Sequence, residues 1–198
     1  MNFIIQTHAP YLYDWFVRPP MITNRYIHRH LKKQLQLEGR TVLDFGSGTG
    51  TLCSMFSPQQ YFGIDSDHQR VEYAQKKHPE HSFHVLNDTK IPYADQSMDY
   101  IVIVAVLHHI SNEDLHIYIE EFKRMLKPTG SMFIMEPCFS QNSPISNRFM
   151  RWADRGKYIR NELEYFALFK DKFECKVINR FKKCFLYNEL FFTTHPKH

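Results

Sequence analysis

Apolar runs and amphipathic stretches alternate along the chain, and the alternation predicts the order of its elements. Helices are expected to begin near Thr51 and to cover 69–77 and 112–126, where Ser111 is a suitable N-cap. Short apolar runs predict the strands, which are expected at 41–45, 61–65, 82–86, 100–104 and 130–135. Strands that alternate with helices are joined by right-handed crossovers and form a mostly parallel sheet.

The two ends of the chain depart from this alternation. Aromatic residues at helical spacing and then apolar positions over 22–37 predict two short helices at the start. A loop rich in Ser, Asn and Pro precedes a predicted helical segment over 146–171. Two final runs, 174–181 and 188–194, predict strands joined by a short loop.

The most informative residues follow the first predicted strand, where Phe45 leads into Gly46-Ser47-Gly48-Thr49-Gly50. The second strand then ends at Asp65, about 20 residues further on, as in nucleotide-binding α/β folds. Glycines let the backbone approach a ligand closely, and a carboxylate at the next strand tip can accept hydrogen bonds from a ribose diol. These residues therefore predict a site for a cofactor that contains a nucleoside.

Two common phosphate-binding loops do not fit this segment. The dinucleotide fingerprint G-x-G-x-x-G would place its third glycine at Thr51. A P-loop fails because no Gly-Lys-Ser/Thr sequence closes the turn. A nicotinamide oxidoreductase is therefore disfavoured and stays open only as an alternative that a binding test with NAD would settle.

Five motifs in chain order resemble the class I S-adenosylmethionine-dependent methyltransferases, in particular the small bacterial type similar to methyltransferase domain 11. The first three are an acid before G-x-G-x-G at 44–50, an acid at the tip of strand two at 65, and an acid after strand three within 86–99. The last two are an apolar strand ending in Leu-His-His at 101–109 and Leu-Lys-Pro-x-Gly at 126–130. The resemblance is close over 39–137 and loose elsewhere.

The resemblance implies a fold and a domain organisation. The expected fold is α/β and doubly wound: a Rossmann-like, seven-stranded, mostly parallel sheet with an antiparallel C-terminal edge hairpin and helices on both faces. One methyltransferase domain is expected over 1–198. Its parts would be N-terminal lid helices at 1–38, a cofactor-binding core at 39–137, an acceptor-side segment at 138–172 and a C-terminal strand pair at 173–198.

The resemblance also implies that S-adenosyl-L-methionine is the cofactor. Its amino-acid part is expected against the backbone of the glycine loop, its ribose at Asp65 and its adenine amino group at Asp88. The residues expected to bind it are Asp44, Phe45, Gly46, Ser47, Gly48, Gly50, Asp65, Ser66, Asp88, Thr89 and Ala105. Three alternatives stay open: Asp44 could hold the glycine loop, Asp65 could cap the following helix, and Asp88 could be a turn residue.

The candidate catalytic residues are His109, His108 and Glu136, with His109 favoured to face the crevice. Methyl transfer displaces a sulfonium in line, so the enzyme mainly aligns the acceptor and excludes water. A base is needed only where the acceptor holds its proton tightly. Alternatively, the histidines pack near the cofactor and orient their loop, and Glu136 is solvated or caps a helix.

Acceptor specificity is expected from segments outside the common core. Tyr11 and Trp15 are expected to cover the acceptor as part of a lid, or otherwise to pack against the sheet. Arg155 and Arg160 are expected to bind a carboxylate or phosphate bidentately, or otherwise to lie on a solvated helix face. These features favour an acidic small-molecule acceptor. A protein or lipid acceptor, and a cofactor-binding protein without transfer activity, remain alternatives.

Composition excludes several further classes. The net charge of +4 comes without a dense basic run, and four cysteines are scattered without a C-x-x-C pair. We therefore expect no nucleic-acid partner, no metal and no disulfide framework. The 198 residues contain neither a signal-peptide pattern nor an apolar run of membrane-spanning length. A cytoplasmic monomer or homodimer without membrane insertion is expected.

Overall fold

The computed structural model describes residues 27–154, 157–183 and 186–197. The chain divides into two compact units, Met1–Asn87 and Asp88–His198. The predicted fold class is confirmed, because the fold is α/β with mainly parallel strands and antiparallel C-terminal strands. The expectation of a single methyltransferase domain over the whole chain stays a prediction.

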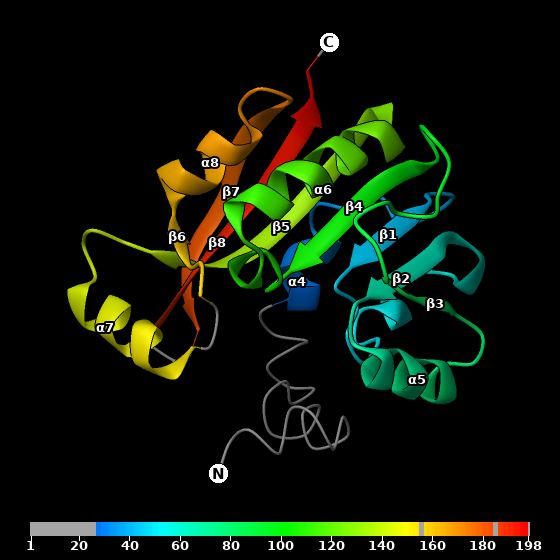
Figure 1. The fold of residues 1–198 in the computed structure, drawn as a ribbon, viewed down its shortest axis with the longest axis horizontal. Coiled ribbons are helices and arrows are strands. Elements are labelled where there is room, and N and C mark those ends of the chain that lie inside the picture. Colours follow the sequence, from blue (N-terminus) through cyan, green and yellow to red (C-terminus); the bar gives the residue numbers. More distant parts are fainter. Residues whose placement is uncertain (1–26, 155–156, 184–185, 198) are drawn as a thin grey trace. The chain divides into compact units, whose positions relative to one another are not determined.

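The first unit is a parallel three-stranded arrangement in the order β3-β2-β1 (Figure 1). Its elements are α4 Arg29–Lys32, β1 Val42–Phe45, β2 Tyr61–Asp65, α5 His68–Lys77 and β3 Ser82–Val85. All four residues of β1 are buried, which is typical of a strand covered on both faces. Helix α5 packs against β2 and β3 through Val71 and Ala74.

The second unit combines a parallel pair with an antiparallel end, in the order β4-β5-β8-β7. Its elements are β4 Met98–Val104, α6 Asn112–Met125, β5 Leu126–Phe139, α7 Pro144–Ala153, β6 Arg160–Asn161, α8 Glu162–Phe169, β7 Phe173–Lys183 and β8 Tyr187–Pro196. The predicted C-terminal hairpin is present as β7 and β8. The two-residue β6 pairs with the end of β5 and adds an eighth strand to the predicted seven.

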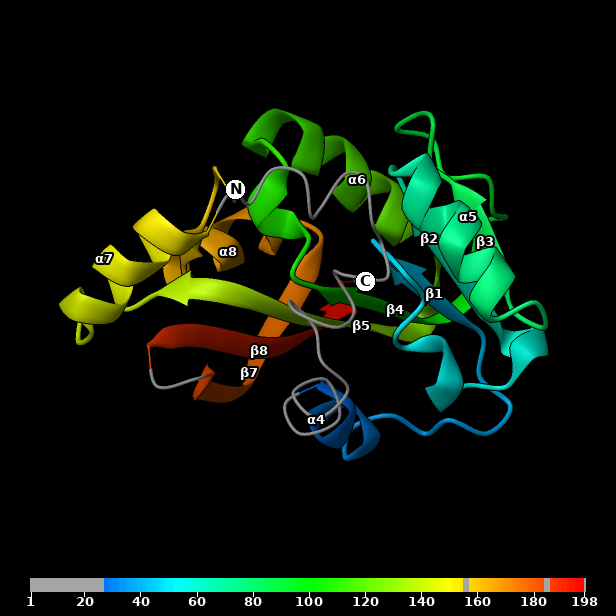
Figure 2. The ribbon, with the colours of Figure 1, turned by 90° about the horizontal axis from the view of Figure 1, so that it is seen from below.

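Two helices cover one side of the second unit's strands. Helix α6 begins after Ser111, whose hydroxyl accepts from the N–H of Asp114, so the predicted N-cap is confirmed. Figure 2 shows α6 and α8 on the same side of β4 and β5, and the two helices contact one another. Phe166 and Phe169 of α8 pack their rings against Phe192 of β8. This aromatic cluster joins α8 to the antiparallel end of the unit.

Two predicted helices are wrong. The segment after Thr51 forms only two three-residue 3₁₀ helices, Cys53–Met55 and Pro58–Gln60. The extended residues Phe56 and Ser57 separate them, and Pro58 favours the extended conformation of Ser57. The predicted helix over 146–171 is two helices separated by β6. A capping box in which Asn161 and Glu164 exchange hydrogen bonds begins α8 and prevents one continuous helix.

The helix predicted over 22–37 is also shorter than expected where the structure describes it. Its described part begins with a π-helical pair at 27–28, continues as α4 and ends at Lys32, after which 33–34 form a turn. By contrast, β5 begins at Leu126 rather than at residue 130. Leu126 pairs with Met98 of β4, and a register shift separates this pair from the rest of the β4–β5 ladder.

Candidate functional site

The glycine loop leaves the end of β1 in a backbone conformation that suits glycine. Gly46, Gly48 and Gly50 have φ angles of 78°, 54° and 77°, all in the left-handed region. The N–H groups of Gly46 and Ser47 both donate to the carbonyl of Ile64, at 2.8 and 2.9 Å. The loop is therefore tied to β2 and turns tightly above the strand ends of the first unit.

Gly50 is needed for packing as well as for its backbone angle. A Cβ atom at this position would lie 2.8 Å from Cζ of Phe83 and 3.1 Å from Cδ2 of His78. Both distances are too short for carbon atoms to tolerate without movement, so a larger residue would displace the loop from β3. The third glycine of the motif thus sets the position of the loop, while the first two shape its turn.

Asp65 joins the glycine loop to the tip of β2. Its Oδ2 accepts the N–H of Gly48 at 2.8 Å, and its Oδ1 accepts the N–H of Asp67 at 2.9 Å. A carboxylate has about four acceptor sites, so two further hydrogen bonds are within its capacity. The helix cap is Asp67, which accepts from Gln69 and Arg70 at the start of α5. The alternative that Asp65 caps this helix is therefore wrong.

Ser47 supplies a polar group in the same loop that its surroundings leave unsatisfied. The residue is buried, and within the described ranges its Oγ has no hydrogen-bond partner. The hydroxyl is packed against β2, where a Cβ atom on Gly63 would lie 2.9 Å from it, so it fills the space under the loop. The left-handed glycines and the spare capacity of Asp65 fit the amino-acid and ribose parts of the expected cofactor.

Asp44 occupies a structural position behind the loop. It is buried, and its Oδ2 accepts the phenol hydroxyl of Tyr61 at 2.6 Å. This short bond to an ionised acceptor joins β1 to β2 and was not foreseen from the sequence. Next to it, Phe45 is buried in the core, whereas Ser66 is exposed after β2.

Asp88 and Thr89 lie at the start of the second unit. Oδ1 of Asp88 accepts the N–H of Thr89 at 2.6 Å and its hydroxyl at 3.3 Å, which closes a local turn. The carboxylate of Asp88 is exposed, whereas Thr89 is half-buried. These contacts correspond to the turn-residue alternative, and the adenine contact of Asp88 stays a prediction.

The chain bends sharply where β4 ends at Val104. Ala105 has a φ angle of 56°, which is unusual for a residue with a Cβ atom. Its N–H donates to the carbonyl of Met135 at 2.8 Å, so pairing with β5 holds the residue in place. Such backbone strain gathers at functional sites, which is consistent with the position of this turn before the two histidines.

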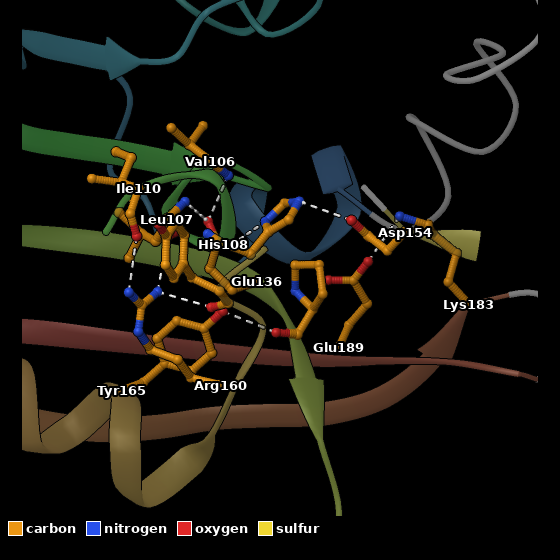
Figure 3. A network of polar contacts seen from close by, with 12 residues as sticks. Val106, Leu107, His108, Ile110, Glu136, Asp154, Arg160, Tyr165, Lys183 and Glu189 are labelled. Atoms are coloured by element: carbon orange, nitrogen blue, oxygen red, sulfur yellow. Dashed lines mark hydrogen bonds and ion pairs between the residues drawn. The ribbon is translucent and has the colours of Figure 1, made fainter. Parts of the chain in front are cut away.

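A buried carboxylate organises the loop after this turn (Figure 3). Oε1 of Glu136 accepts the N–H groups of Val106 and Leu107 at 2.7 and 2.9 Å. Its Oε2 accepts the N–H of His108 at 3.3 Å and lies 2.7 Å from Nδ1 of the same ring. Because an ionised carboxylate only accepts, Nδ1 of His108 carries a proton. Glu136 therefore caps the 3₁₀ turn Leu107–His109, and a helix cap was one of the alternatives for this residue.

His108 is enclosed by acids, and its charge depends on them. Nε2 lies 3.6 Å from Oδ1 of Asp154, and the carbonyl of His108 accepts the N–H of Tyr158 at 3.0 Å. Burial of the ring lowers its pKa. The hydrogen bond and charge of Glu136, together with the charges of Asp154 and Glu189, outweigh burial and raise the pKa of His108 above its usual value. The acids thus stabilise the imidazolium form of this ring relative to that of a free histidine.

His109 lies next to this ring but is exposed. The two ring centroids are 4.0 Å apart, and the N–H of His109 donates to the carbonyl of Val106 at 2.9 Å. His108 is enclosed, whereas its neighbour faces solvent.

Arg160 is fully engaged within the second unit (Figure 3). Its guanidinium donates to the carbonyls of Leu107, Tyr158 and Ile110, each at 2.9 Å, and twice to Oδ1 of Asn112, at 3.0 and 2.6 Å. These contacts use all five donors of the side chain. The structure therefore contradicts the expectation that Arg160 binds an acidic acceptor, because no donor is left for a carboxylate.

The remaining predicted site residues, Tyr11, Trp15 and Arg155, lie outside the residues that the structure describes. Conversely, Asp154, Tyr158 and Asn112 were missed by the sequence analysis. Asp154 and Tyr158 contact His108 from a distant segment, and Asn112 accepts from Arg160; no spacing in the sequence signals such contacts. Within the described ranges, no group of His, Cys, Asp or Glu has the arrangement of a metal site. Among the described helices, none combines the length and apolar character needed to cross a bilayer.

The raised pKa of His108 predicts a pH-dependent stability. A group whose pKa rises on folding stabilises the protein fully below its unfolded pKa, about 6.5 for histidine, and loses this contribution as the pH passes its folded pKa. We expect the melting temperature of the wild type to fall relative to that of His108→Asn as the pH rises above about 6.5. Calorimetry of both proteins across neutral pH measures this; a constant difference would contradict it.

The comparisons with known proteins agree with this geometry. The family described as a methyltransferase domain matches residues 43–134. Demethylmenaquinone methyltransferase of Chlorobaculum parvum is 32% identical over 126 residues, which is 60% of this chain and 51% of the relative. A tRNA (carboxymethyluridine(34)-5-O)-methyltransferase of Arabidopsis thaliana is 31% identical over 61% of this chain and 30% of the relative. The chain thus spans about half or less of these curated relatives.

A solved structure confirms the fold at lower identity. The YcgJ protein from Bacillus subtilis superposes with a TM-score of 0.72 at 17% identity, covering 86% of this chain and 99% of its own. At that identity the likeness concerns the fold alone. The match over residues 43–134 and the shared fold support the resemblance to the class I S-adenosylmethionine-dependent methyltransferases.

Proposed function

We propose that the protein transfers a methyl group from S-adenosyl-L-methionine to a small-molecule acceptor. The observation that carries this proposal is the glycine loop of the first unit, with its left-handed backbone and the spare acceptor capacity of Asp65. When bound, the cofactor supplies a methyl group activated by positive sulfur. The protein therefore has to bind, orient and exclude water rather than provide a nucleophile.

The residues of the first unit have distinct binding roles in this proposal. The backbone of the glycine loop, that of Ser47 included, binds the amino-acid part of the cofactor. Asp65 accepts the two ribose hydroxyls while its contact with Gly48 keeps the loop closed. Asp88 belongs to the second unit, and its adenine contact stays a prediction from its motif position alone.

The second unit contributes the candidate acid–base groups. Glu136 and His108 are buried and already engaged, so we assign them to positioning the loop of the histidines. His109 is exposed beside them and is the candidate base for an acceptor that loses a proton. Ala105 is assigned to the turn that directs this loop.

Two acceptor classes are suggested by the relatives' names, a quinone-type small molecule and a tRNA. The small molecule is favoured because the net charge is only +4 and the basic residues form no dense run. Because the donors of Arg160 are all engaged within the protein, the proposed preference for acidic acceptors rests on Arg155.

Transfer of labelled methyl groups tests the proposal. We expect purified protein with methyl-labelled S-adenosylmethionine to label a component of an organic extract containing demethylated quinones, and Asp65→Ala to abolish the label. Label in bulk tRNA would contradict the small-molecule acceptor. Binding of S-adenosylhomocysteine without label in any metabolite or tRNA pool would favour the cofactor-binding protein without transfer activity.

A further inference from the structure

Helix α7 is attached to the second unit by one face only. On that face Met150 is fully buried, and its sulfur accepts the N–H of Asn188 at 3.3 Å. Asn147 closes the preceding loop by donating to the carbonyl of Ser140 at 2.8 Å and accepting its N–H at 3.1 Å. The hydroxyl of Ser146 is likewise buried and accepts from Lys182. These contacts fix the orientation of the helix.

The opposite face of α7 presents large apolar side chains to solvent. Ile145 is 75% exposed and Trp152 is 82% exposed. Phe149 lies between them in sequence, and its ring centroid is 6.1 Å from that of Trp152. Residues at positions i, i+4 and i+7 share one face of a helix, so the three side chains form a continuous apolar stripe. Such a stripe on a surface helix calls for a partner.

Two arginines run beside this stripe. Arg148 and Arg151 are both exposed. Arg148 is three residues after Ile145 and four before Trp152, so it lies beside the stripe, and Arg151 lies one turn further round the helix from it. Arg151 also contacts the ring of Phe139, with 4.8 Å between the guanidinium carbon and the ring centroid. The helix sequence Pro144–Ala153 contains no acidic residue. The outer face of α7 is therefore both apolar and positively charged.

We propose that the outer face of α7 binds an anionic lipid surface. An apolar stripe containing Trp and Phe and flanked by Arg is the pattern of a helix that lies in a membrane interface, where apolar groups enter the acyl boundary and cations meet lipid phosphates. The helix is docked through Met150, so it presents this face already formed. Binding of this kind is peripheral and needs no spanning segment.

Other occupants fit the same face less well. A two-fold contact between copies would bring each Arg148 and Arg151 close to their equivalents, and like charges oppose such a pairing. A nucleic acid would use the arginines and Trp152, but it offers no apolar layer for Ile145. A lipid interface is the one partner that matches the stripe and the charges together.

Vesicle binding tests the proposal without cofactor or acceptor, so its failure is distinct from a failure of methyl transfer. We expect the protein to co-sediment with vesicles of phosphatidylcholine and phosphatidylserine, less with phosphatidylcholine alone, and less as salt rises. The sequence has two Trp residues, so Trp15→Phe leaves Trp152 as the reporter. Its fluorescence should shift to the blue and be quenched by brominated lipid.

Matched variants make the test specific to α7. Trp152→Ala should weaken vesicle binding about tenfold, and replacing Arg148 and Arg151 by Gln should weaken it roughly fivefold per charge. Leu163→Ala is the control, because Leu163 is 75% exposed but lies on α8. The proposal fails if the wild type ignores anionic vesicles or if the control loses binding equally. It also fails if Trp152→Ala dissociates a dimer, or if RNA is bound in place of vesicles.

Discussion

Replacing Asp65 by Ala should lower the affinity for S-adenosylhomocysteine by at least about 100-fold, because hydrogen bonds to a charged group contribute roughly 1.5–3 kcal/mol each and two are lost. The carboxylate has two acceptor sites beyond its bonds to Gly48 and Asp67, enough for a ribose diol. Its removal also releases the N–H of Gly48, so the glycine loop loses one of its ties to β2. Isothermal titration calorimetry measures the change.

Asp67 supplies the matched control for this experiment. It is another carboxylate, two residues away, and its role is to cap α5. Asp67→Ala should cost about 1 kcal/mol of stability, typical of a lost N-cap, and leave cofactor affinity nearly unchanged. Asp65→Asn should retain part of the affinity, since its amide oxygen still accepts. Equal affinities of Asp65→Ala and the wild type would refute the role given to Asp65.

The largest stability effect is expected at Arg160. Its guanidinium is buried and makes five hydrogen bonds, three of them to the carbonyls of Leu107, Tyr158 and Ile110. Arg160→Ala leaves these carbonyls and Asn112 without their donors, and we expect the free energy of unfolding to fall by about 3–5 kcal/mol. Urea unfolding followed by circular dichroism measures this difference.

Two variants separate the hydrogen-bond geometry of Arg160 from its charge. Arg160→Lys keeps the charge but cannot reproduce the planar fork, so it should lose most of the same stability. Arg180→Ala removes an exposed arginine that pairs with Glu162 at 2.7 Å, and a surface pair contributes about 1 kcal/mol or less. If Arg160→Ala were no more destabilising than Arg180→Ala, the structural role of Arg160 would be wrong.

Local signals in the sequence predicted much of the fold. Strand β2 matches its predicted range of 61–65, because an apolar run there ends abruptly at a charged residue. The N-cap at Ser111 was equally readable, since its hydroxyl and the acids after it act within one turn. The capping box of Asn161 and Glu164 was present as a pattern too, and weighing it would have divided the helix predicted over 146–171.

The residues of the candidate site also differ in how far the sequence predicts them. The glycine loop and Asp65 are close in sequence and belong to one motif, so their contact followed from the pattern. The contacts of Arg160 with Leu107 and Asn112 join segments about fifty residues apart, and no periodicity encodes them. Glu136 was a candidate only as the tip of a strand. Its bond to His108 depends on the register of β4 and β5, in which Val104 pairs with Met135. This register places the carboxylate of the next residue, Glu136, against the loop of the two histidines.

The central claim is that the first unit binds S-adenosylmethionine through the glycine loop and Asp65. Calorimetric titration of the wild type with S-adenosylhomocysteine tests this most directly, with NAD as the comparison ligand. The account predicts saturable binding of one S-adenosylhomocysteine per chain and no heat from NAD. Absence of binding by S-adenosylhomocysteine, or equal binding of NAD, would contradict it.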